Sequence, residues 1–100
     1  MKRSVRVTPR ATKDLDRILG YLREQSPSAA KAFSVRFFEI LQQLADFPLT
    51  SRATDHPHIR YVNTQPFPYL LFLRRDGERI DVIAIRHGAR DPRVMPGRPR

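Results

Sequence analysis

The amino-acid sequence predicts an α+β fold in which an antiparallel two-helix hairpin covers one small, mostly antiparallel sheet. Two observations carry this prediction. Residues 9–47 contain two apolar stripes at helical spacing, and each stripe follows a Ser-Pro or Thr-Pro start signal. Residues 69–87 contain two apolar runs separated by the letters RDGE, a pattern typical of a β-hairpin. The expected order is an N-terminal strand, two helices and a three-strand antiparallel meander.

The first expected element is a short strand, because valines alternate with polar residues in RSVRVT (3–8). Thr8 then suits a helix N-cap, and Pro9 suits the first helical position. The apolar spacing that follows predicts a helix over residues 9–25. Its stripe comprises Ala11, Leu15, Ile18, Leu19 and Leu22. We expect Tyr21, beside this stripe, to lie in the core.

The second expected helix starts with the same signal, Ser26 followed by Pro27. Its stripe comprises Ala30, Phe33, Phe37, Ile40, Leu41, Leu44 and Phe47. Phe38 is expected to pack with this stripe, and Pro48 ends the helix. Because the link between the two helices is so short, they are expected to lie antiparallel as a hairpin.

The second half of the chain supplies the sheet that the two stripes need. A short strand is expected at IRYV (59–62), after a polar loop at residues 49–58. In the hairpin that follows, Asp76-Gly77 suits a two-residue type I′ turn, which sets Arg74 opposite Arg79. Both hairpin strands are apolar on both faces, so we expect them to be central in the sheet.

Length and composition predict a single domain over residues 1–92 and an Arg/Pro-rich flexible tail over residues 93–100. The formal net charge of +9 favours a nucleic acid, an anionic membrane or an acidic protein as partner. Cysteine is absent, which excludes disulfides and fits the cytoplasm. No apolar run has the length of a membrane span, so no membrane association is expected.

No cofactor is expected, and no metal site either. His56 and His58 have a spacing compatible with a metal, but no cysteine or third ligand stands near them.

Positive charge gathers where the last expected strand ends, in IRHGARDPR (85–93). Five arginines stand between residues 86 and 100, against one acidic residue, Asp91. This density predicts a surface for an acidic partner. The candidate partner-binding residues are Arg60, Arg86, His87, Arg90 and Arg93. Three roles are open for Arg60: catalysis, partner binding, or an ion pair with Asp81 or Glu78.

Several segments, in order, resemble the RelE/ParE superfamily of toxins from bacterial type II toxin–antitoxin systems, and the ParE-like branch most closely. They are VTPRATKDLDRILGYL, PSAAKAF, LADFPLTSR and PYLLFLRRDGERIDVIAIRHGARDP. The most specific pieces are Asp14-Leu15 with Tyr21, the strand that holds Arg60, and HGARD (87–91). The resemblance runs from about Val5 to Pro92.

The resemblance implies a RelE/ParE-like fold and a small toxin encoded beside an antitoxin. In the superfamily, a flexible C-terminal segment of the antitoxin wraps the toxin and silences it, and operator DNA is bound only through the antitoxin. RelE-like members cut messenger RNA in the ribosome, whereas ParE-like members block DNA gyrase. Because both activities occur on the same fold, only the identity of individual residues can distinguish a ribonuclease from a gyrase inhibitor.

Cutting RNA at a 2′-hydroxyl requires a base, an acid and a cation that stabilises the phosphorane. RelE-like members of the superfamily use lysines before and on the middle strand and a tyrosine near the C-terminus, and some relatives use a glutamate base. In this chain no lysine follows Lys31, no tyrosine follows Tyr69, and no glutamate lies between Glu39 and Glu78. A ribonuclease would therefore depend on Arg60, Arg74, Arg86 and His87. A lone histidine at a strand end is more often structural than catalytic, since a pKa near neutrality is not sufficient for catalysis.

The leading hypothesis is accordingly a ParE-like toxin that inhibits gyrase and is neutralised by a cognate antitoxin with an acidic C-terminal segment. The first alternative is a ribosome-dependent endoribonuclease of RelE type. The second alternative is a non-toxic member that acts only in the antitoxin complex and in operator regulation.

Overall fold

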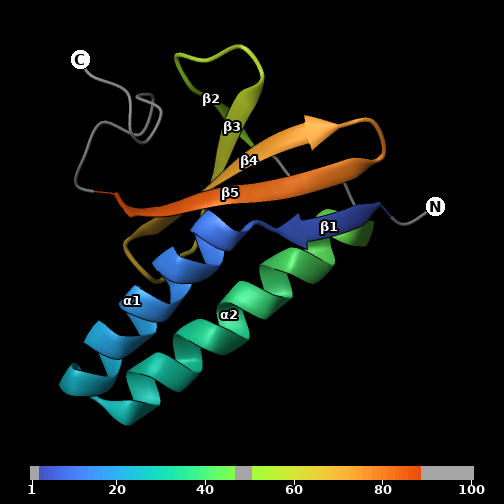
Figure 1. The fold of residues 1–100 in the computed structure, drawn as a ribbon. Helices are drawn as coiled ribbons and strands as arrows, with labels where there is room; N and C mark the ends of the chain where they lie inside the picture. The colour runs from blue at the N-terminus through green and yellow to red at the C-terminus, as the bar shows by residue number, and fades with distance from the viewer. Residues whose placement is uncertain (1–2, 47–50, 89–100) are drawn as a thin grey trace.

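The protein folds into two layers, a helical hairpin and a five-stranded sheet, in a computed structural model that describes residues 3–46 and 51–88 (Figure 1). The elements are β1 (Ser4–Val7), α1 (Pro9–Gln25), α2 (Pro27–Asp46), β2 (Arg52–Ala53), β3 (Ile59–Asn63), β4 (Tyr69–Asp76) and β5 (Arg79–His87). Both helices lie on one face of the sheet, as Figure 1 shows. The α+β prediction is confirmed. The predicted tail, residues 93–100, lies outside the described residues.

The sheet has the strand order β1-β5-β4-β3-β2 and is mixed. Strands β3, β4 and β5 form the expected antiparallel meander, with the hairpin strands in central positions. Strand β1 joins β5 in parallel, with Val5 opposite Ile80. Within the stretch expected to be a loop, the two residues of β2 pair with β3, so that part of the loop prediction is wrong.

Both helices begin where the sequence predicts. Thr8 caps α1, since its hydroxyl oxygen accepts a hydrogen bond from the Ala11 N–H at 3.2 Å, and Pro9 occupies the first position. Helix α1 covers the predicted residues, 9–25. Ser26 precedes α2, and its carbonyl accepts from the N–H groups of Ala29 and Ala30. The predicted helix boundaries are therefore confirmed at these positions.

The main core lies between the helices and the sheet and contains both predicted stripes except Phe47, which, like Pro48, lies outside the described residues. Its buried members are Ala11, Ile18, Phe33, Phe37, Ile40, Leu44, Val62, Tyr69, Leu71, Leu73, Val82 and Ile85. Two expectations are wrong: Tyr21 is 56% exposed and Phe38 is 61% exposed. Phe38 follows Phe37 by about 100° around α2 and so faces away from the core. Tyr21 lies in the last part of α1, which ends at Gln25, and the tip of the helical hairpin extends beyond the sheet (Figure 1).

A second, smaller apolar cluster lies on the opposite face of the sheet, which we call the helix-free face. Its described members are all strand residues: Ile59, Leu70, Phe72 and Ala84 are buried, with Tyr61 and Ile83 partly buried beside them. Side chains of a strand alternate between faces, so Arg74, two residues after Phe72, belongs to this face too.

The β4–β5 turn differs from the predicted one. Gly77 and Glu78 are its central residues, with Asp76 paired to Arg79, and Gly77 alone has a positive φ, +61°. Glycine at the first central position is typical of a type II′ turn, so the type I′ prediction is wrong. The shift of one residue places Arg74 opposite Asp81 instead of Arg79, replacing a like-charge pair with a favourable one.

A β-bulge in β5 reverses the alternation of side chains near its end. Leu73 pairs with Val82 and Phe72 with Ala84, which leaves Ile83 as the extra residue. Consequently Ile85 faces the helices while Ile83 packs on the helix-free face. Simple alternation along the strand predicts that Ile83, Ile85 and His87 share one face, and this prediction is wrong for Ile83 because the sequence carries no sign of the bulge.

Asp14 of α1 supports β5 beyond this bulge. Pairing between β1 and β5 ends at Val7–Val82, and the Asp14 Oδ2 atom then accepts a hydrogen bond from the Ile85 N–H at 3.0 Å. The carboxylate is 1% exposed, and the guanidinium of Arg17 lies 3.3 Å from its other oxygen. The buried carboxylate thus takes the place of a strand partner at this point of β5.

Candidate binding surface

Arg60 extends from β3 on the face that carries the helices, since its partner across β4 is the core residue Leu73. Its guanidinium donates to the hydroxyl and the carbonyl oxygen of Ser51, at 2.6 and 2.5 Å. Asp81, one of its expected partners, instead accepts from Arg6 and Arg79. Of the pairings suggested for Arg60, the one with Asp81 is therefore wrong.

Arg86 and His87 are neighbours in sequence but lie on opposite faces of the sheet. Arg86 is opposite Leu70 on the helix-free face, and His87 is opposite Tyr69 on the helix face. The His87 and Tyr69 rings meet edge to face, with centroids 5.5 Å apart. Arg90 and Arg93, the other two candidate residues, lie outside the described residues.

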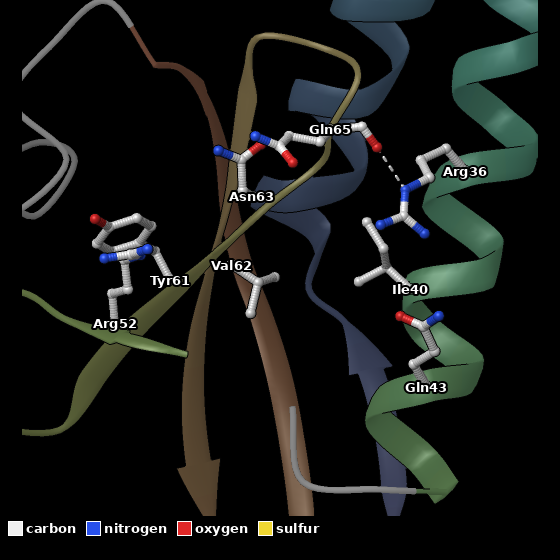
Figure 2. Close-up of a pocket in the computed structure, with 8 residues that line it drawn as sticks. All are labelled: Arg36, Ile40, Gln43, Arg52, Tyr61, Val62, Asn63 and Gln65. Carbon is white, nitrogen blue, oxygen red and sulfur yellow. Dashed lines mark hydrogen bonds between the residues drawn. The ribbon is translucent and has the colours of Figure 1, made fainter. Parts of the chain in front are cut away.

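A groove runs between α2 and the edge of the sheet at β3 (Figure 2). It encloses about 410 Å³. Ile40 of α2 and Val62 of β3 form its floor, and the Arg36 Nε–H donates to the Gln65 carbonyl at 2.8 Å. Figure 2 shows Arg52 and Tyr61 side by side on the other side of β3.

A second hollow of about 580 Å³ continues from this groove toward the end of β5. Arg52, Tyr61, Asn63 and Gln65 line both cavities, and His87 and Gly88 line only the second. Among the described residues that line the two hollows, the charged ones are arginines, and amides supply further polar groups. This surface is therefore suited to an anionic ligand or partner.

Residues 5–92 match the family model described as ParE toxin of type II toxin-antitoxin system, parDE. The chain belongs to this family. A solved structure with a similar fold is titled as a chromosomal ParDE TA system from P. aeruginosa. Its TM-score is 0.71 at 21% sequence identity, over 86% of this chain and 96% of that one. No curated protein matches the chain.

The four residues on which a ribonuclease would depend are dispersed in this ParE-family chain. Arg60 and His87 belong to the helix face, whereas Arg74 and Arg86 belong to the helix-free face. On the latter face, Arg74 stands four residues along β4 from Leu70, the partner of Arg86, which is about 13 Å at the rise of a strand. The structure therefore does not gather the four residues at one point of the sheet.

The groove also contains residues that sequence reasoning missed. Arg36 lies on the predicted second helix, and nothing in the sequence distinguishes it from an ordinary solvent-exposed arginine. Arg52 lies in the stretch that was predicted to be a loop. Only the pairing of β2 with β3 brings Arg52 opposite Tyr61.

In the part of the chain that the structure describes, no group of three or more potential metal ligands lies close enough together to hold a metal ion. No helix in that part is long and apolar enough to cross a membrane.

Tyr69 gives a testable pH dependence. Burial of its hydroxyl, and secondarily the nearby charge of Tyr21, raise the pKa of Tyr69 above its ordinary value. The unfolded chain then loses this proton at lower pH than the folded one, so stability falls as the pH rises above about 10. We expect Tyr69→Phe to lose less stability than the wild type between about pH 8 and pH 10.5.

Urea unfolding at both pH values measures this difference, and each protein at about pH 8 serves as its own reference. Equal losses of stability in the wild type and Tyr69→Phe would show that titration of Tyr69 does not cause the pH dependence.

Proposed function

We propose that this chain is the toxin of a type II toxin–antitoxin system, acts in the cytoplasm by inhibiting DNA gyrase, and is neutralised by a cognate antitoxin. The membership of residues 5–92 in the ParE toxin family is the observation that carries the proposal. The dispersal of Arg60, Arg74, Arg86 and His87 over two faces of the sheet supports gyrase inhibition over RNA cleavage.

The proposal is tested by inducing the protein alone in bacterial cells and following plasmid supercoiling and messenger RNA integrity over time. We expect negative supercoiling to fall before messenger RNA is cleaved. Purified protein should inhibit supercoiling by gyrase in vitro, and co-expression of the antitoxin encoded beside the toxin gene should restore growth.

The same experiment separates the alternatives. Early cleavage of messenger RNA with unchanged supercoiling would identify a RelE-type endoribonuclease. Growth without arrest, at a level of soluble protein that binds the antitoxin, would identify a non-toxic member.

A further inference from the structure

A pocket of about 270 Å³, which we call the arginine pocket, lies where β1 starts, α2 ends and β4 turns into β5. Two backbone hydrogen bonds join these segments: the Arg3 N–H donates to the Ala45 carbonyl at 2.7 Å, and the Ser4 N–H donates to the Glu78 carbonyl at 3.2 Å. Figure 1 shows the three segments together at one end of the molecule. None of the described residues that line this pocket lines the groove between α2 and β3, so the two sites are separate.

Three arginines from three segments line the arginine pocket. Arg60 of β3 lies opposite Leu73 of β4, so Arg60 and Arg75 are diagonal neighbours on the helix face, about 7–8 Å apart at their Cα atoms. Arg3 stands two residues before Val5, which packs on the core, and alternation therefore directs Arg3 to the same face. Positive charge from distant parts of the sequence thus gathers at one point.

No carboxylate neutralises this charge. Among the described residues, none of the three arginines forms an ion pair, and the lining of the pocket includes no acidic side chain. The side-chain hydrogen bonds of Arg60 and Arg75 go to neutral oxygens of Ser51 and Gly77. Because like charges at this distance repel one another, an anion bound between them would be stabilised by all three.

The pocket also holds its donors in place above an apolar floor. Ser51 accepts two hydrogen bonds from the Arg60 guanidinium, which fixes its orientation and leaves its remaining N–H groups for a ligand. Leu44 and Leu73 are buried beneath the arginines, and the partly buried Ile80 lies beside them. Water is therefore excluded from one side of the cationic groups, which strengthens their attraction for an anion.

We propose that the arginine pocket binds a phosphate monoester, whose phosphate group lies between Arg3, Arg60 and Arg75. A monoester carries nearly two negative charges and three terminal oxygens, and guanidinium groups match such oxygens through parallel hydrogen bonds. A carboxylate or an internal phosphodiester has two such oxygens and a single charge, which three arginines would exceed.

The size of the pocket restricts the ligand further. A volume of about 270 Å³ is close to the lower end of the range for small-molecule pockets, about 300–1,000 Å³. The phosphate group therefore belongs to a small metabolite or to the phosphorylated end of a nucleic-acid strand. This ligand site goes beyond the proposed function, because neither gyrase inhibition nor neutralisation by an antitoxin requires it.

The test measures ligand affinity of the full-length protein by calorimetry, with melting temperatures to verify folding. The proteins are the wild type, the double variant Arg60→Gln/Arg75→Gln, the single variant Arg3→Gln and the control Arg23→Gln/Lys31→Gln. The control removes the same charge as the double variant from exposed positions on α1 and α2 that do not line the pocket.

The probes separate the chemical groups and their sources. Adenosine monophosphate carries a monoester, and adenosine lacks it. A single-stranded oligonucleotide of about ten residues, too long for the pocket, is used with and without a 5′-phosphate.

We expect adenosine monophosphate to bind the wild type and the control alike, with an affinity that falls as salt is added, and adenosine not to bind. The double variant should weaken binding about tenfold, since it removes two charged but solvent-exposed donors. Arg3→Gln should weaken it about threefold and decides the question if the double variant does not fold. Binding of the 5′-phosphorylated strand in place of the mononucleotide would assign the pocket to nucleic-acid ends.

Equal affinity of the monoester probes for the wild type and every folded variant would overturn the assignment, as would the absence of binding by all of them. Equal binding of the strands with and without a 5′-phosphate, lost in the double variant, would also overturn it in favour of a surface for the nucleic-acid backbone. None of these results depends on whether the protein inhibits gyrase.

Discussion

Replacing Asp14 by alanine is expected to lower the free energy of unfolding by about 3 kcal/mol. The Asp14 carboxylate, 1% exposed, accepts the Ile85 N–H at 3.0 Å from a position 71 residues away in sequence. Its removal eliminates a charge-assisted hydrogen bond and leaves a buried donor without an acceptor. Urea unfolding followed by circular dichroism measures the change.

Two variants make this experiment specific. Asp16→Ala removes an exposed carboxylate from the same helix and is expected to change stability by less than about 0.5 kcal/mol. Asp14→Asn retains an oxygen that can accept a hydrogen bond from the Ile85 N–H, so its loss of stability should be smaller than that of Asp14→Ala. Equal losses for Asp14→Ala and Asp16→Ala would show that the bond to β5 contributes little.

Insertion of one alanine between Ala84 and Ile85 is expected to abolish cooperative folding. The bulge already accommodates one extra residue in β5, and a further one would move every side chain after Ala84 to the other face of the sheet. Ile85, 2% exposed in the core, would then leave the helix face. Arg86 would turn toward the helices and add an uncompensated charge to the core.

Ile83→Ala is the matched control, because it keeps the length of β5 and removes only partly buried apolar atoms. We expect it to cost about 1 kcal/mol and to keep a sharp urea transition. The near-ultraviolet circular dichroism spectrum distinguishes the two variants. An insertion variant with a native spectrum and a sharp transition would mean that β5 can accommodate a second extra residue without loss of the fold.

The helices could be predicted from the sequence because their determinants are local. Thr8-Pro9 and Ser26-Pro27 start them, and the spacing of apolar residues over one or two turns identifies the buried side. The same holds for the existence of β4 and β5, whose composition alone marks them as strands. Membership in the ParE family follows from these ordered segments together.

The arrangement of the candidate surface could not be predicted in this way, because strand register depends on contacts between distant segments. The turn at Gly77-Glu78, the bulge at Ile83 and the hydrogen bond from Ile85 to Asp14 together decide which face Arg86 occupies. The sequence by itself determined both helices, the strands β1, β3, β4 and β5, the order of these elements and the abundance of arginine. Only the tertiary structure decided that Arg86 lies on the helix-free face and His87 on the helix face, since one extra residue in a strand inverts the face of every side chain that follows it.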